Sequence, residues 1–182
     1  CLVGSEMCIR DSGITYHSEI YPCEDLTEEE FKVASLFANT LTDVGVGGKS
    51  FEEMQKIQSA VTGGISASFI LVPDNNNSYS LALQVSSKSL EKNELQMQEL
   101  IASTVSKSKF NEKNRIKDLL NFISSANERS VIQNGHVLAM SNASAQINNI
   151  AATNDMGSGI NFITNTNDCL LYTSDAADED LR

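Results

Sequence analysis

The sequence has few basic residues, few histidines and no long apolar run. Lys and Arg number 13 against 24 Asp and Glu in 182 residues, which gives a formal net charge of −11. Proteins that bind nucleic acid neutralise phosphates with clusters of basic side chains, so this charge disfavours nucleic acid as a partner. No apolar stretch approaches the roughly 20 residues that cross a bilayer, and we therefore expect no membrane partner.

The two histidines, His17 and His136, lie far apart in the sequence. An inverted zinc-peptidase motif, H-x-x-E-H, needs two histidines on one helical turn, with a glutamate between them as general base. Neither histidine has that spacing. The sequence therefore predicts no catalytic residue, no cofactor-binding residue and no metal ligand, and we interpret His17 as an exposed or supporting histidine on the polar side of a strand.

Three other patterns resemble sites but have simpler structural explanations. Residues 45–50 read G-V-G-G-K-S, but the spacing of a phosphate-binding loop fails and a predicted helix precedes them. The three glutamates at 28–30 fall in the first turn of that helix, where its dipole favours negative charge. Cys23 is followed by two acids, a setting that disfavours a nucleophilic thiolate.

Local signals are strongest between residues 40 and 72. Ser50 and Glu53 form a predicted capping box at the start of a helix. Gly63 and Gly64 can end that helix and reverse the chain. The alternation of apolar residues and serines over residues 65–72 then predicts a half-buried strand.

The rest of the chain gives further strands and helices. A strand is predicted over residues 13–21, and Thr27 with Glu30 forms a second capping box for a helix to about residue 42. Turn-forming residues at 73–78 separate the strand at 65–72 from another at 79–85, which predicts an antiparallel hairpin.

After the hairpin the pattern is helical. Ser89 could cap a helix that runs to about residue 106, and a long helical stretch follows with a kink near Gly135. Residues 136–145 are small, so we expect them to pack closely against a neighbouring helix. Residues 146–168 are weakly periodic, and we expect poor order there.

A family resemblance is carried by residues 36–69, LFANTLTDVGVGGKSFEEMQKIQSAVTGGISASF. They resemble the opening of the third domain of presequence-protease-type zinc metallopeptidases, a branch of the pitrilysin/insulinase superfamily. The most specific part is T-G-G-I-S-A-S, at residues 62–68. The similarity continues through residues 90–110 and 114–145.

The resemblance implies an incomplete α+β pitrilysin-like domain, with two layers and an antiparallel or mixed sheet that has helices on one face. It implies a scaffold and chamber wall of a peptidase that degrades unfolded peptides such as targeting presequences, with zinc in another domain of the parent protein. An acidic wall would suit basic targeting peptides. His136, in an N-G-H that resembles a family G-H pair, is expected to make a hydrogen bond across helices.

The partners implied are unfolded peptides and the missing N-terminal half of the parent. A second interpretation stays open, in which the parent is a non-catalytic binding or assembly subunit with the same fold. The two differ in whether H-x-x-E-H occurs upstream in the same gene. This chain alone is expected to be inactive, whichever parent it comes from.

Both ends of the chain resemble translated sequencing adapters. Residues 1–12, CLVGSEMCIRDS, and the start of residues 169–182, CLLYTSDAADE, match two frames of transposon-based adapters, so we expect residues 13–168 to be an internal metagenomic fragment. Cys23 is then the only natural cysteine. One thiol forms no intrachain disulfide, which favours the cytoplasm or an organellar matrix over secretion.

Overall fold

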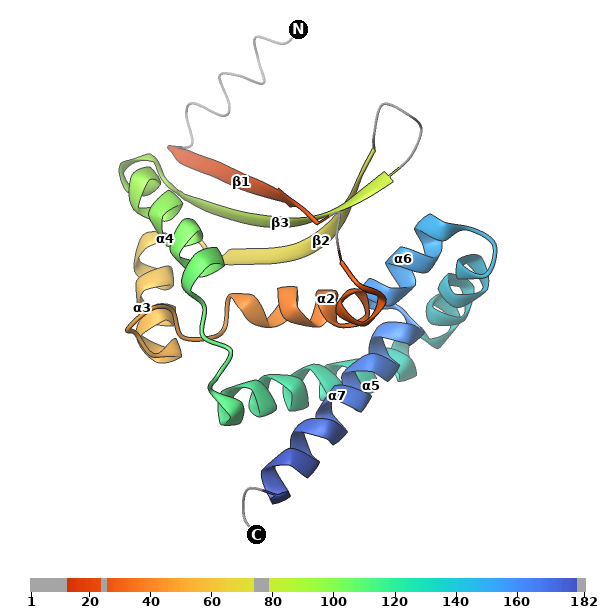
Figure 1. The fold of residues 1–182 in the computed structure, drawn as a ribbon. Helices are drawn as coiled ribbons and strands as arrows, with labels where there is room; N and C mark the ends of the chain where they lie inside the picture. Colours follow the sequence, from red (N-terminus) through yellow and green to blue (C-terminus); the bar gives the residue numbers. More distant parts are fainter. Residues whose placement is uncertain (1–12, 24–25, 74–78, 180–182) are drawn as a thin grey trace, which may run out of the picture.

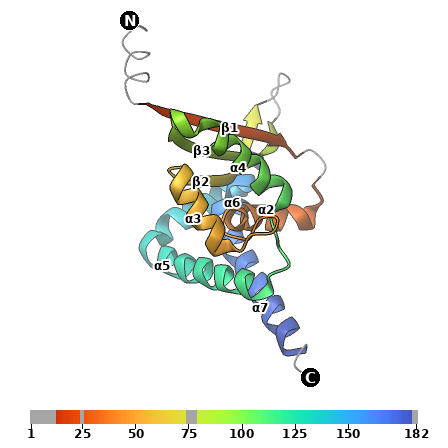
Figure 2. The ribbon, with the colours of Figure 1, turned by 90° about the vertical axis from the view of Figure 1, so that its left-hand side faces the viewer.

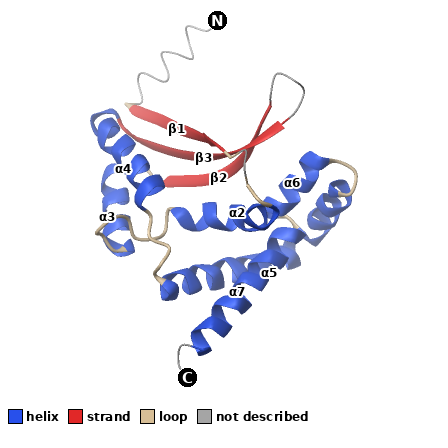
Figure 3. Ribbon diagram, viewed as in Figure 1, coloured by secondary structure: helices blue, strands red, loops and turns tan. Residues whose placement is uncertain are grey.

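The computed structural model describes residues 13–23, 26–73 and 79–179, and one antiparallel sheet organises them (Figure 1). The strand order is β1-β3-β2. The described elements are β1 (Ile14–Pro22), α2 (Glu28–Leu41), α3 (Phe51–Val61), β2 (Ile65–Pro73), β3 (Tyr79–Leu90), α4 (Glu94–Lys107), α5 (Lys113–Ala145), α6 (Asn149–Ser158) and α7 (Ile160–Glu179). The predicted α+β class is confirmed, and the helices lie on one side of the sheet (Figure 3).

Both predicted capping boxes are formed. Thr27 Oγ1 accepts from the Glu30 amide at 3.3 Å, and Glu30 Oε2 accepts from the Thr27 amide at 2.9 Å. Ser50 and Glu53 repeat the arrangement at the start of α3, with distances of 3.3 and 2.9 Å. Each box satisfies two amides that a helix N-terminus would otherwise leave unpaired, which fixes where α2 and α3 begin.

The predicted hairpin is also formed, and its second strand is longer than expected. β2 pairs antiparallel with β3 from Ile65 opposite Ser87 to Pro73 opposite Tyr79. The connection at residues 74–78 lies outside the described residues. β3 continues to Leu90, so the prediction that Ser89 caps a helix is wrong. Pairing with β1 extends the strand through this residue, and a 3₁₀ turn (Glu91–Asn93) then leads into α4.

β1 is a strand as predicted, but its faces are reversed relative to the sequence pattern. Thr15, His17, Glu19 and Tyr21 are the half-buried positions, whereas Tyr16 and Ile20 are 72% and 52% exposed. His17 is therefore half-buried on the helix-facing side of β1, so the interpretation of it as an exposed histidine is wrong, whereas that of a supporting histidine is not contradicted. Alternation indicates a strand, but it does not tell which face the neighbouring helices will cover.

Two hydrophobic clusters hold the helices in layers. The first joins the sheet to α2 and α4, and its buried members are Ala38, Leu41, Leu83, Val85, Met97 and Ile101. The second joins α2 to α5 and α7 through Leu36, Leu120 and Phe162. As a result, α5 and α7 lie on the side of α2 away from the sheet, as the turned view shows (Figure 2).

The long helix α5 is kinked where the sequence predicts. Asn134, beside Gly135, has the non-helical angles φ −123° and ψ 21°. The expected close packing of residues 136–145 is not observed, because Leu138 is the only fully buried residue among them. Small side chains permit close approach, but each buries little apolar area and so supplies little driving force for it.

Residues 146–168 are helical, which contradicts the expectation of poor order. α6 and α7 meet at Gly159, and the fully buried Asp155 of α6 caps α7. Asp155 accepts hydrogen bonds from the amides of Ile160 and Asn161 and from the Asn161 side chain at 2.7 Å. A cap supplied by the preceding helix is not visible as periodicity, which explains the error.

Candidate functional site

Three titratable side chains form a hydrogen-bonded chain on the helix-facing side of β1. His17 Nε2 lies 3.0 Å from Glu19 Oε1, and the Tyr21 hydroxyl donates to Glu19 Oε2. The strand brings them together because residues two apart point to the same face. Sequence reasoning treated His17 alone and missed the H-x-E-x-Y spacing that would have indicated this contact.

Electrostatics favour a charged Glu19 and a neutral Tyr21. The hydrogen bond from Tyr21 lowers the pKa of Glu19, burial opposes that shift, and His17 lowers it further. The same hydrogen bond, with burial, raises the pKa of Tyr21 to about 12. Glu19 is therefore a carboxylate acceptor and Tyr21 a neutral donor, and their hydrogen bond fixes the orientation of both side chains on the helix-facing side of β1.

The other histidine, His136, does not belong to the hydrogen-bonded group of His17, Glu19 and Tyr21. His136 is exposed on α5 beyond the kink, and its side chain makes no hydrogen bond with another residue in the described ranges. The expected hydrogen bond across helices is therefore not formed. Among residues 13–23, 26–73 and 79–179, no group of three or more His, Cys, Asp or Glu side chains could hold a metal ion.

The remaining site-like patterns have structural roles. The glycine turn at residues 45–50 is tied to the end of α4, since the Gly47 amide donates to the Lys107 carbonyl at 2.9 Å. The half-buried Cys23 donates from its thiol to the Tyr21 carbonyl; the two acids after it lie outside the described residues. No helix in the described part of the chain is long and apolar enough to cross a membrane.

The side of the sheet opposite the helices forms a surface that we call the outer sheet face. Residues directly opposite in the register share a face. The members are Ile14, Tyr16, Ser18, Ile20 and Pro22 of β1, Ser66, Ser68, Ile70 and Val72 of β2, and Ser80, Ala82, Gln84, Ser86, Lys88 and Leu90 of β3.

Hydroxyl groups cross the middle of the outer sheet face. Ser18 and Ser86 oxygens lie 2.9 Å apart, Gln84 donates to Ser18 at 2.8 Å, and Ser66 stands opposite Ser86 in the register. Apolar side chains flank them, and Lys88 is the only charged member. No acidic residue of the described ranges therefore belongs to this face.

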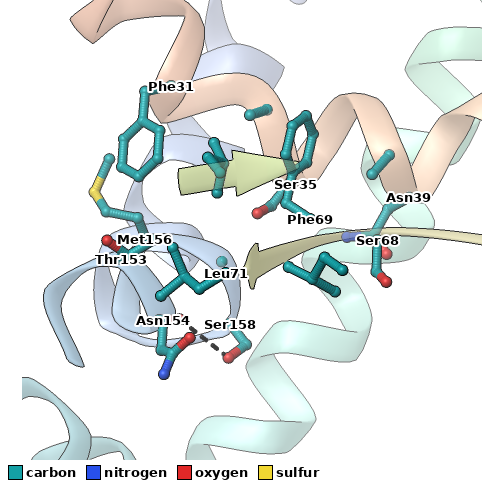
Figure 4. A pocket seen from close by; sticks show the side chains of 15 residues that line it. Phe31, Ser35, Asn39, Ser68, Phe69, Leu71, Thr153, Asn154, Met156 and Ser158 are labelled. Carbon is teal, nitrogen blue, oxygen red and sulfur yellow. Dashed lines mark hydrogen bonds between the residues drawn. The ribbon is translucent and has the colours of Figure 1, made fainter. Parts of the chain in front are cut away.

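A pocket of about 250 Å³ opens between β2, α2 and α6 (Figure 4). We call it the β2 groove. Its lining residues come from α2 (positions 31, 34, 35, 38 and 39), β2 (positions 68–71), Leu81 of β3 and α6 (positions 153, 154 and 156–158). None of them carries a charged side chain, so the groove can bind a ligand through apolar contacts and hydrogen bonds but offers no acid or base for catalysis.

Comparison with protein families gives a match over most of the chain. The matching model is that of the region associated with peptidases of family M16, subfamily C, and it covers residues 9–168. The chain belongs to this peptidase-associated family. This membership supports the resemblance found in the sequence, and what it supports is a region associated with a peptidase.

Curated proteins similar to this member of the peptidase-associated family are named "Presequence protease, mitochondrial". The Drosophila melanogaster protein is 26% identical over 148 residues, which are 80% of this chain and 14% of that protein. The Aspergillus oryzae protein is 25% identical over 154 residues, which are 82% of this chain and 15% of that protein. The chain thus spans about a seventh of the length of the relatives it matches.

Proposed function

We propose that this chain is a non-catalytic scaffold and chamber wall within a longer zinc metallopeptidase that degrades unfolded peptides such as targeting presequences. The observation that carries the proposal is the match to presequence proteases over four fifths of the chain, although it spans only a seventh of their length. In this proposal, a segment of that size forms part of the wall of a larger peptidase chamber and is not a whole enzyme.

The geometry suits a wall. The helices stand behind the sheet and pack against it through the cluster around Val85 and Ile101, which makes the sheet a rigid support. No helix of the described ranges covers the outer sheet face, which presents serine hydroxyls, Gln84, Tyr16 and Ile20. Such a surface can contact an unfolded peptide through apolar area and hydrogen bonds without selecting one charge.

Zinc in this proposal belongs to another domain of the parent. The residues described here do not fit a zinc site, because no cluster of His, Cys, Asp or Glu ligands is present among them. The chain's own contribution is to shape and close the chamber, and closure of two halves around a peptide would exclude water from a site completed by the missing N-terminal half.

Two further parts of the proposal concern origin and compartment. We take residues 13–168 as the natural segment and the flanking residues as adapter-derived. The relatives carry "mitochondrial" in their names, and we extend this to an organellar matrix, in keeping with a segment that has a single cysteine, Cys23.

The test has a genetic and a biochemical arm. The gene should be read upstream for H-x-x-E-H, and the longer product should cleave a fluorogenic unfolded peptide only with zinc bound, whereas the 182-residue chain should cleave nothing. A longer gene without the motif would favour a non-catalytic binding or assembly subunit. Metal-dependent cleavage by the short chain alone would overturn the proposal.

A further inference from the structure

One long edge of the sheet has no partner strand among the residues that the structure describes. β2 is the last strand in the order β1-β3-β2, and β3 pairs with it along its whole length from Ile65 to Pro73. On its other side, no backbone hydrogen bond connects β2 with another segment of the described chain. Such an edge presents a row of free amide and carbonyl groups that can pair with an extended chain.

The β2 groove lies along this open edge. Residues 68–71 of β2 all line it, although consecutive side chains of a strand point to opposite faces. A pocket on one face would be lined by alternate residues, so contact with four consecutive residues places the groove beside the backbone edge. α6 forms the opposite wall, where Asn154, Met156 and Ser158 are among the lining residues (Figure 4).

The lining defines the kind of ligand. Phe31, Phe69, Leu71 and Met156 supply apolar contact, and Ser35 and Asn39 supply hydrogen-bonding groups. The absence of any charged lining side chain makes a charged segment costly to bury there. The volume of about 250 Å³ is just below the range of about 300–1,000 Å³ usual for small-molecule pockets. Short side chains of a strand therefore suit it better than a large compact ligand.

We propose that the β2 groove binds an extended, uncharged peptide segment, which adds to the open edge of β2 as a further strand. The choice of peptide as the ligand rests on the function proposed above, whereas the open edge and the neutral groove do not. Backbone pairing with β2 supplies affinity with little dependence on sequence, and the neutral lining selects against charged side chains at the contacted positions.

Backbone-modified peptides test the pairing directly. The probe is a fluorescein-labelled peptide of about six residues, the usual length of a strand, made of Ser, Val, Thr and Ala. Two matched probes carry N-methyl groups on its odd or its even amides. A strand added at an edge donates hydrogen bonds to that edge through only one set of alternate amides. Binding to the full chain is measured by fluorescence anisotropy. One N-methylated probe should bind about tenfold or more weakly than the unmodified probe, and the other should bind equally well. Equal binding of both, or no binding of the unmodified probe, would overturn the proposal.

A variant pair locates the site. Asn154→Trp places a large ring in the groove from an exposed position of α6, and Asn149→Trp makes the same change on that helix outside the groove. We expect the first to weaken probe binding by about tenfold or more and the second to change it by less than about twofold. Circular dichroism of both variants checks that they fold.

A third variant separates the groove from the outer sheet face. Tyr16→Ala, on that face, should leave probe binding unchanged, because Tyr16 does not line the groove. Loss of binding in Tyr16→Ala with retention in Asn154→Trp would place the peptide on the outer sheet face and refute the groove. Upstream absence of H-x-x-E-H would refute the peptidase parent without affecting these results, so the two proposals fail separately.

Discussion

Tyr21 donates a hydrogen bond to Glu19 across one intervening residue of β1. This contact joins the two side chains whose pKa values shift in opposite directions on the strand. The pKa of Glu19 falls below 4.5, and that of Tyr21 rises from 10.0 to about 12. Both shifts stabilise the same pair, a carboxylate that accepts from a neutral phenol.

Removal of the Tyr21 hydroxyl should return the pKa of Glu19 toward its ordinary value. In Tyr21→Phe the largest cause of the lowered pKa is lost while the burial that opposes it remains. An NMR titration of the Glu19 carboxyl carbon measures the change. Tyr16→Phe is the matched control, since Tyr16 lies exposed on the other face of β1; an equal change in that variant would contradict the assignment.

The Glu19–Tyr21 pair should also make the free energy of unfolding depend on pH in both the acid and the alkaline range. Because the folded pKa of Glu19 is depressed, its contribution is present above pH 4.5 and is lost as the pH falls through the lower folded value. Because the folded pKa of Tyr21 is raised, its contribution is full below pH 10 and is lost as the pH rises toward 12. Urea unfolding across pH measures both, and Tyr21→Phe should flatten the alkaline part of the profile. An unchanged alkaline profile in that variant would show that another group causes the loss.

The junction between α6 and α7 should not tolerate a side chain at Gly159. A Cβ there would lie 1.9 Å from Asp155 Oδ1, so Gly159→Ala must displace the carboxylate that caps α7. Loss of a cap costs about 1 kcal/mol, and the displacement of a buried acid adds to it. Thermal unfolding of Gly159→Ala measures this cost. Gly48→Ala is the control, because a Cβ at Gly48 meets nothing within 4 Å; equal stability of the two variants would contradict the predicted role of the cap.

Core packing beneath the sheet should depend on one face of α4. Ile101 is fully buried against the sheet and α2, so Ile101→Ala should lower the free energy of unfolding by about 2–5 kcal/mol. Leu95 is 75% exposed on the same helix, and Leu95→Ala should change stability by less than about 0.5 kcal/mol. Chemical denaturation compares them, and similar losses would mean that this face of α4 is not the buried one.

The sequence predicts those elements whose signals are local. The capping boxes at Thr27 and Ser50 and the kink beside Gly135 depend on residues within a few positions, and all three are confirmed. Strand pairing is less local: Ser89 has good capping chemistry, yet it lies in a ladder with β1, which is distant in the sequence. Local capping propensity does not decide the structure where pairing with a strand distant in the sequence supplies more hydrogen bonds.

The candidate sites depend almost entirely on long-range arrangement. The reversal of β1 follows from which side α2 and α4 cover, and the sequence of β1 alone, with apolar Tyr16 and polar His17, favours the opposite choice. The β2 groove needs α6 beside β2, and α6 falls where weak periodicity predicted poor order. The family resemblance is sequence-local, by contrast, and the family match over residues 9–168 supports it.

The open side of β2 has a practical consequence for work on this chain. Within the described ranges no segment pairs with that side of β2, and two copies can satisfy such an edge by joining their sheets into one. We therefore expect self-association that grows with concentration and competes with any added peptide. Light scattering over a dilution series would set the range in which the chain is monomeric and its affinity for other molecules can be read.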